Sequence, residues 1–325
     1  AFSILCTIAW AFGPNLLTLA LLFFTWALVT LTLIDFDHQL LPDDITIPLL
    51  WLGIIYLGSL IVFLFHSLFY LDGFTGKVVY KISLSTIIEL FSSPANIDIL
   101  IRTVVLASVV SIGAAIIGFP IAYYMAKYTT PKIKIFFYLA IMLPLWSSYL
   151  VRVYSWKLIL AKEGIISWFF AKLHLSWMLE AILALPVIGG PSLSISYLGM
   201  FLVFTYIWLP FMILPIQASL ERVPNTLINA SYDLGATKGQ TFFKVILPLA
   251  LPGIAAGSIF TFSLTLGDYI IPYIIGTSKF FIGQAVYTHQ GTAGNIPLAA
   301  AFSLVPIAVM TVYIYFAKKL GAFSA

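Results

Sequence analysis

Residues 224–248 read PNTLINASYDLGATKGQTFFKVILP and join two long apolar stretches at roughly 195–217 and 251–273. Pro224 suits the first turn of a helix, because its missing N–H would be unpaired there in any case. Residues with apolar or small side chains then recur at i, i+3, i+4 and i+7, which places them on one helical face. They are Leu227, Ala230, Ser231 and Leu234. The pattern predicts a short helix with one apolar, small-residue face.

A second helix is expected directly after the first. Gly235 stands where a residue with positive φ commonly ends a helix. Thr237 and Gln240 then follow with the spacing of a capping box, which indicates a new helix start. Because this pair lies between two membrane spans, we expect both helices outside the bilayer, on the cytoplasmic side. Such a pair can dock into a groove of a soluble partner; the alternative is an ordinary loop that only connects the spans.

The composition is that of a polytopic membrane protein. Of 325 residues, 62% are hydrophobic and 9% are charged, whereas soluble domains are about 45–50% apolar and about 25% charged. So few charges cannot cover a water-facing surface, which excludes a soluble enzyme, and the 16% of aromatic residues exclude disorder. A span needs about 20 mostly apolar residues. Seven candidates lie at roughly 16–34, 47–69, 99–126, 135–155, 195–217, 251–273 and 297–317.

The net charge and the single cysteine exclude further classes of protein, and the distribution of basic residues indicates an orientation. The net charge is only +4 and the basic residues are scattered, so the footprint of a nucleic-acid-binding protein is absent. The single cysteine, Cys6, excludes a disulfide framework and a cysteine metal site. Alternating spans put residues 127–134, 218–250 and 318–325 on one side, where lysine and arginine are denser. That side is expected to be cytoplasmic.

The 224–248 stretch resembles the EAA loop of ABC importer permeases. Ala230–Ser231, three residues, Gly235, nine residues and Val245–Ile246–Leu247–Pro248 match the spacing of that loop in full. Asn229 and Ser231 stand where the family has Glu and a second Ala, and Asp233 is a nearby acid. The resemblance implies that this loop couples to an ATPase. The coupling residues would be Asn229, Ala230, Ser231, Asp233, Gly235, Ala236, Leu247 and Pro248.

Other blocks extend the resemblance over roughly residues 50–320. GFPIAYYMAKY at 118–128, MLPLWSSYLVRVYSWKLIL at 142–160 and the block at 247–276 look most like the spermidine/putrescine-type permeases. The resemblance implies an all-α type-1 permease bundle of six spans at 55–325, with one extra N-terminal span. It also implies a bacterial inner-membrane location and three kinds of partner. These are a cytoplasmic ATPase, a second permease subunit and an extracytoplasmic substrate-binding protein.

ATP chemistry is expected in a partner chain. The sequence has no G-x-x-x-x-G-K-[ST] loop, and the nearest stretch, Gly73–Lys77, is too short. We therefore expect no enzymatic activity and no cofactor in this chain, with ATP and Mg on the partner ATPase. A secondary transporter or channel is the alternative transport class, but such a protein would not need the two-helix loop, and no inverted repeat is evident.

The candidate substrate path is built around Asp268, at the end of an apolar span. An acid within a membrane is a hypothesis for a functional site. A cationic cargo would favour this acid together with aromatic rings, through charge and cation–π attraction. The rings are Trp146, Tyr149 and Tyr273. The alternative is that Asp268 lies in water at the outer interface. Arg152 also argues against a path for cations, because its charge would repel them.

A different family is indicated near the N-terminus. TWALVTLTLIDFDHQLLPDDITIPLLWLG at 25–53 resembles the first catalytic block of the type IV prepilin peptidases, in which Asp35 would be one of two catalytic carboxylates. The second carboxylate belongs to a Gly-x-Gly-Asp block, which the sequence lacks. We therefore expect residues 1–54 to be a truncated, inactive peptidase-like segment; the alternative function is a prepilin leader peptidase. A metal site is a less favoured reading of Asp35, Asp37, His38, Asp43 and Asp44.

Overall fold

The computed structural model describes residues 53, 55, 57–186 and 188–319. The chain divides into two compact units, Ala1–Phe65 and His66–Ala325. In the first unit the described residues 57–65 are helical. The predicted span at 16–34 and the acids from Asp35 to Asp44 lie outside the described residues, and the predicted span at 47–69 is described only in part.

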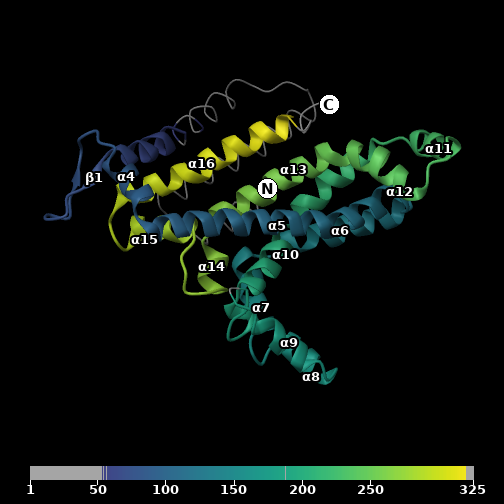
Figure 1. Cartoon of the computed structure of the whole chain (residues 1–325), viewed down its shortest axis with the longest axis horizontal. Helices are drawn as coiled ribbons and strands as arrows, with labels where there is room; N and C mark the ends of the chain where they lie inside the picture. The colour runs from purple at the N-terminus through teal and green to yellow at the C-terminus, as the bar shows by residue number, and fades with distance from the viewer. Residues whose placement is uncertain (1–52, 54, 56, 187, 320–325) are drawn as a thin grey trace, which may run out of the picture. The chain divides into compact units, whose positions relative to one another are not determined.

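Four helices of the described residues are long and apolar enough to cross a membrane. They are α5 (Pro94–Lys127), α10 (Tyr197–Glu221), α16 (Ile296–Lys319) and the helix Lys238–Gly267, most of which is α13 (Leu247–Gly267) (Figure 1). They confirm four of the predicted spans. The predicted span at 251–273 extends too far, however, because the helix ends at Gly267. Asp268 has an extended ψ of 128°, and a separate short helix, α14, begins at Ile270.

A fifth predicted span, at 135–155, is broken in two. The helices α6 (Pro131–Trp146) and α7 (Tyr149–Ile159) meet at an angle of 95°, so the prediction of one continuous helix is wrong. Ser147 and Ser148, between them, have extended ψ angles of 152° and 135°. Pro144 in the last turn of α6 has no N–H to continue the helical hydrogen bonds. The described residues therefore contain four spans, or five if the bent pair counts as one.

The spanning helices pack through small residues. A Cβ atom added to Gly253 of α13 would lie 2.5 Å from the carbonyl oxygen of Pro215, and one added to Gly257 would lie 2.8 Å from the sulfur of Met212. Such contacts mean that α10 and α13 approach as closely as only glycine allows, which is a common way for membrane helices to associate. Elsewhere on α10, large side chains such as Val203 and Phe204 are buried in the core.

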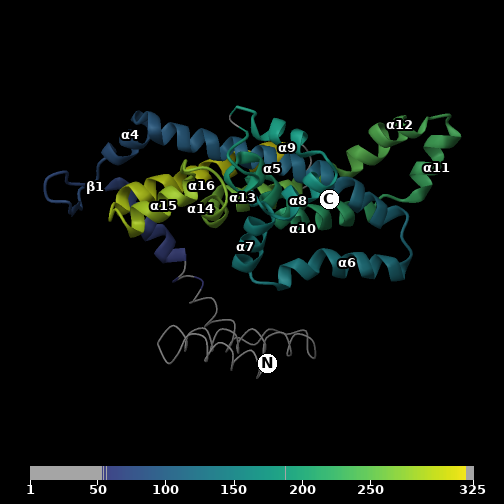
Figure 2. The same cartoon turned by 90° about the horizontal axis from the view of Figure 1, so that it is seen from below.

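Shorter elements lie at the two ends of these helices. A two-stranded antiparallel sheet, β1 (Tyr70–Leu71) with β2 (Val78–Val79), lies at the end opposite α11 and α12 (Figure 2). The described short helices are η1 (His66–Leu68), α4 (Ser85–Ser92), α8 (Ile165–Lys172), α9 (Ser176–Leu183), η2 (Leu193–Ile195), α11 (Asn225–Asp233), α12 (Lys238–Thr241), η3 (Phe242–Ile246), α14 (Ile270–Ile274) and α15 (Ile282–Gly291). In chain order, α12 and η3 precede α13 at one end, and α14 follows it at the other.

Candidate functional site

The predicted break between α11 and α12 is present. Gly235 has a φ of +82°, its N–H donates to the carbonyl of Tyr232 at 2.8 Å, and the Ala236 N–H donates to the carbonyl of Ser231 at 3.0 Å. These are the two hydrogen bonds of a Schellman motif, which ends a helix with a residue in the left-handed region. Gly235 is therefore the C′ residue that the sequence predicts.

The second helix begins as predicted. The Thr237 hydroxyl accepts a hydrogen bond from the Gln240 N–H at 3.3 Å, and the Gln240 side-chain oxygen accepts one from the Thr237 N–H at 2.8 Å. This reciprocal pair is a capping box. The hydroxyls of Ser231 and Thr241 lie 2.6 Å apart and connect α11 to α12. The two helices and their break form a compact, hydrogen-bonded pair, which we call the docking loop (residues 224–246).

The docking loop exposes large apolar side chains. Leu234 is 89% exposed and Phe243 is 67% exposed, and Leu227 is exposed as well. On the inner side, Ile228 packs against the core cluster that contains Ile246. The face that the sequence predicts is therefore mostly turned outward, and only its Ser231 is half-buried. Apolar groups that remain exposed outside the spans are available to a partner.

The other predicted coupling residues lie in and just after this loop. Asn229, Ala230 and Asp233 are exposed on α11, and Ala236 is half-buried in the break. Leu247 and Pro248 form the first turn of α13, where Pro248 is exposed. Apart from its two chain neighbours, no described residue has an atom within 4 Å of a Cβ added to Gly235. The structure thus brings all eight residues to one end of the molecule.

Two lysines on either side of the turn between α5 and α6 contact the end of α10, just before the docking loop. Lys127 Nζ donates to the carbonyl oxygen of Val223 at 2.5 Å, and Lys134 Nζ lies 2.5 Å from a carboxylate oxygen of Glu221. Residues 127–134 and 218–250 therefore share one end of the bundle, as the alternation of spans predicts. The assignment of that end to the cytoplasm stays a prediction.

Asp268 lies at the other end of α13, with both carboxylate oxygens occupied. Oδ1 accepts hydrogen bonds from the N–H groups of Ile270 and Ile271 at 2.8 and 2.9 Å, and Oδ2 accepts one from the Tyr149 hydroxyl. The backbone bonds cap α14, and the tyrosine bond connects α7 to the end of α13. Two of the predicted path residues, Asp268 and Tyr149, are therefore direct partners.

These two residues line a cavity of 380 Å³. Trp208 of α10 lies on its wall and stacks on the Tyr149 ring, with ring centroids 5.9 Å apart. Arg152 lies over the Tyr149 ring, its guanidinium carbon 5.8 Å from the centroid, but it does not line the cavity. The full lining is Tyr149, Trp208, Ser263, Leu264, Gly267, Asp268, Tyr269 and Ile270.

The structure does not bring the other two predicted residues to this cavity. Trp146 is 77% exposed and Tyr273 is 75% exposed, and neither is among its lining residues. Trp208, which does line it, gave no signal in the sequence because it stands within a span rich in aromatic residues. Asp35 lies outside the described residues, and within the described part no group of three His, Cys, Asp or Glu could hold a metal ion.

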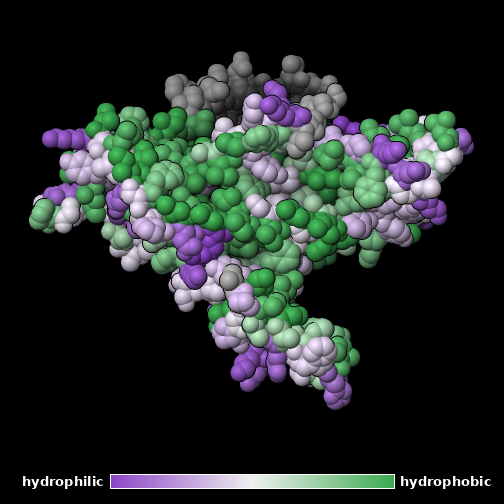
Figure 3. Space-filling model, in the orientation of Figure 1, coloured by the Kyte–Doolittle hydropathy of each residue, from purple (hydrophilic) through white to green (hydrophobic). Residues whose placement is uncertain are grey.

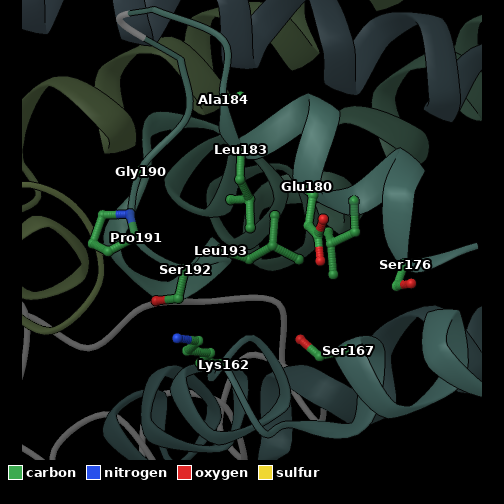
Figure 4. A pocket seen from close by; sticks show the side chains of 11 residues that line it. Lys162, Ser167, Ser176, Glu180, Leu183, Ala184, Gly190, Pro191, Ser192 and Leu193 are labelled. Carbon is green, nitrogen blue, oxygen red and sulfur yellow. The ribbon is translucent and has the colours of Figure 1, made fainter.

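A larger cavity of 510 Å³ lies beside α8 and α9 and differs in its charges. Lys162 and Glu180 both line it, together with Ser167, Ser176 and Ser192 (Figure 4). Figure 4 shows Lys162 and Ser192 facing each other from different segments. Because a lysine lines this cavity, it suits a small cation less well than the cavity at Asp268, whose only charged lining residue is an acid.

Comparison with known proteins identifies a permease family over the C-terminal two thirds of the chain. Residues 114–321 match the family described as binding-protein-dependent transport system inner membrane component. The chain is 56% identical to the inner membrane ABC transporter permease protein YdcU of Escherichia coli K12 over 86% of its own length and 88% of that protein. It is 29% identical to the spermidine/putrescine transport system permease protein PotB of Salmonella typhimurium SL1344, over 67% of this chain and 72% of that protein.

Two further matches concern the N-terminal part and the fold. Residues 22–93 match the type IV leader peptidase family, a stretch that continues past the predicted segment 1–54. The fold is similar to a crystal structure of a bacterial ABC transporter that imports alginate, with a TM-score of 0.63, 16% identity, and coverage of 88% of this chain and 96% of that one. The chain therefore belongs to the binding-protein-dependent transport system inner membrane components, the permease subunits of ABC importers.

Proposed function

We propose that this permease imports polyamines or a similar small cation across the bacterial inner membrane. The single observation that carries the cargo class is the pairing of Asp268 with aromatic rings in one cavity at the end of a span. A carboxylate attracts an ammonium group, and the faces of Tyr149 and Trp208 add cation–π attraction. The likeness to PotB, named for spermidine and putrescine transport, supports the same class.

The arrangement of Asp268 suits a site that releases its cargo. Two backbone N–H groups hold Oδ1 in place, so the carboxylate keeps its direction when a ligand arrives. The Tyr149 hydroxyl occupies Oδ2, and an ammonium group would compete with it. Arg152, which would repel a cation, stands behind the Tyr149 ring and outside the cavity lining.

The energy for transport would come from partner chains. We propose that the docking loop sits in a cleft of a cytoplasmic ATPase, which binds ATP and Mg, while this chain binds no cofactor. A second permease subunit would complete the pore and an extracytoplasmic binding protein would deliver the cargo. The exposed Leu234 supports the docking role, because it lies outside the candidate spans and no other described residue covers it.

Uptake of radiolabelled spermidine and putrescine by cells that express the complete importer tests the cargo class. Asp268→Asn keeps the size of the side chain but removes its charge, and should reduce uptake at least tenfold at normal membrane levels. Asp72→Asn is a matched control, because Asp72 lies on an exposed turn of the same unit, where hydrogen bonds from Thr75 and from the Phe74 N–H hold its pKa below the usual value. It should leave uptake unchanged.

The same assay separates the cargo from the transport mechanism. If the wild-type importer takes up neither polyamine while the permease still co-purifies with its ATPase, the cargo class is wrong and the coupling proposal stands. If Asp268→Asn transports polyamines normally, Asp268 only caps α14 and the cavity is not part of the cargo path.

A further inference from the structure

A groove on the outer surface of α5 has apolar walls and charged groups at one end. It has a volume of 540 Å³ and lies between the first half of α5, the start of α10 and the segment that precedes α15. Its charged lining residues are Asp98, Arg102 and Lys279, and the rest of its lining is apolar apart from one tyrosine. The groove shares no lining residue with the cavity at Asp268 and none with the docking loop.

The apolar part of the groove follows α5 along a single stripe. Ile101, Val105 and Val109 recur four residues apart, so they lie on one side of the helix over a length of ~12 Å. All three side chains are exposed, Val105 by 54%. Leu198 and Phe201 of α10 form the facing wall. Because α5 is long and apolar enough to span a membrane, an exposed apolar stripe of this length is suited to pack against a hydrocarbon chain.

The charged end of the groove has a surplus of positive charge. The Arg102 guanidinium forms an ion pair with Asp98 and donates a second hydrogen bond to the carbonyl oxygen of Phe280 at 2.9 Å. Arg102 is therefore fixed in place and largely compensated by its partner. Lys279 is exposed and forms no ion pair within the described residues. Two cations against one carboxylate leave this end with a net positive charge.

We propose that this groove binds an anionic phospholipid, with one acyl chain along the stripe and the phosphate at Lys279 and Arg102. The two parts of the groove match the two parts of such a lipid, since the apolar stripe suits a chain and the cations suit a phosphodiester. Figure 3 shows the same division, with hydrophobic surface over α5 and a hydrophilic patch where the connection between α14 and α15 meets it. Basic groups at a membrane surface favour anionic over neutral lipids.

A second groove provides the comparison. It has a volume of 590 Å³, lies between α5, α13 and α16, and has no charged residue in its lining. Hydrocarbon chains can fill it, but nothing in its lining would distinguish one headgroup from another. Of these two grooves, we therefore expect a headgroup preference only from the one that contains Lys279.

Lipid binding to the purified, delipidated importer tests the proposal. Native mass spectrometry and thermal unfolding would be followed with dioleoyl phosphatidylglycerol, dioleoyl phosphatidylcholine and inorganic phosphate as separate probes. Phosphatidylglycerol should bind more tightly than phosphatidylcholine. Lys279→Ala should weaken phosphatidylglycerol binding about fivefold, and Lys279→Arg should retain it. Lys172→Ala, which removes an exposed lysine from α8, is the matched control and should change nothing.

The acyl part of the groove is tested by filling it. Val105→Trp should reduce phosphatidylglycerol binding at least tenfold, because the indole occupies the stripe. Val312→Trp places the same ring in the uncharged groove and should leave phosphatidylglycerol binding unchanged. Equal binding of the two lipids to the wild type, or unchanged binding by Lys279→Ala, would overturn the proposal. Competition by inorganic phosphate alone would also overturn it, because the groove would then be a site for a small anion.

Discussion

The two ends of α13 differ in whether the side chains there already have partners within this chain. At one end the docking loop leaves large apolar side chains exposed, Leu234 above all. At the other end the Asp268 carboxylate is hydrogen-bonded at both oxygens. An exposed apolar group gains stability only when a partner covers it, whereas a paired carboxylate binds a ligand only in competition with its present partner. We therefore expect changes at the first end to alter assembly, and changes at the second end to alter cargo affinity.

The largest effect is expected from Gly235→Val. Its φ of +82° strains a β-branched residue by about 1–3 kcal/mol, and that strain is enough to reduce docking roughly tenfold or more. Beyond its chain neighbours, no described residue lies within 4 Å of the new Cβ, so insertion into the membrane should be normal. Co-purification of the ATPase at equal expression, together with cargo uptake, measures the effect, and both should be nearly lost.

A conservative variant at the same position controls for this result. Asn tolerates the left-handed region, so Gly235→Asn should retain most of the ATPase and most of the uptake. A Gly235→Val permease that holds its ATPase and transports normally would mean that the loop is only a connector between spans.

A smaller loss is expected from Leu234→Ala. The side chain is almost fully exposed in this chain, so its removal should leave the thermal stability of the permease unchanged. If it packs into a groove of the ATPase, association should weaken about fivefold. Leu173→Ala removes an exposed leucine beside α8 and should have no effect. Equal ATPase binding by both variants would remove Leu234 from the interface.

A gain rather than a loss is expected from Tyr149→Phe. The change removes the hydroxyl that occupies Oδ2 of Asp268 but keeps the ring that stacks on Trp208. Since a hydrogen bond contributes about 1 kcal/mol net, the KM for polyamine uptake should fall about fivefold, with ATPase association unchanged. A higher KM would mean that the hydroxyl itself contacts the cargo.

The smallest effect is expected from removal of residues 1–46. The permease match begins at residue 114, and both features of α13 lie in the second compact unit. With a start codon before Ile47, uptake should equal that of the full chain. Loss of uptake at normal membrane levels would show that the N-terminal segment serves transport. The chain should also cleave no prepilin, and cleavage that disappears in Asp35→Ala would contradict this expectation.

The same comparison separates what the sequence could predict from what it could not. The docking loop was predictable because its signals are local: Gly235 ends one helix, and Thr237 with Gln240 begins the next. The cavity depends on contacts between distant segments, since Tyr149 and Asp268 are 119 positions apart. The sequence singled out both residues, but it could not pair them or add Trp208 from the middle of a third helix.

The break between α6 and α7 shows a different limit. Hydropathy averaged over a span of about 20 residues does not register two serines, even though Ser147 and Ser148 turn the chain through 95°. Pro144, just before them, is compatible with a bend but is common in spanning helices. Asp268 likewise ends α13 by capping the helix that follows, an effect of geometry that an apolar count cannot detect.

The short π-helix η3 joins α12 to α13 without interruption. Residues from Lys238 to Gly267 form one helix of 30 residues, ~45 Å long, in which Phe242–Ile246 is wound with i→i+5 hydrogen bonds. The docking loop and the Asp268 carboxylate thus lie at opposite ends of one continuous helix, with no loop between them. If the docking loop moves with an ATPase, as proposed, a tilt imposed at α12 should reach the end of α13 and shift Asp268 against Tyr149. A continuous helix would then connect the movement of the ATPase with the strength of cargo binding.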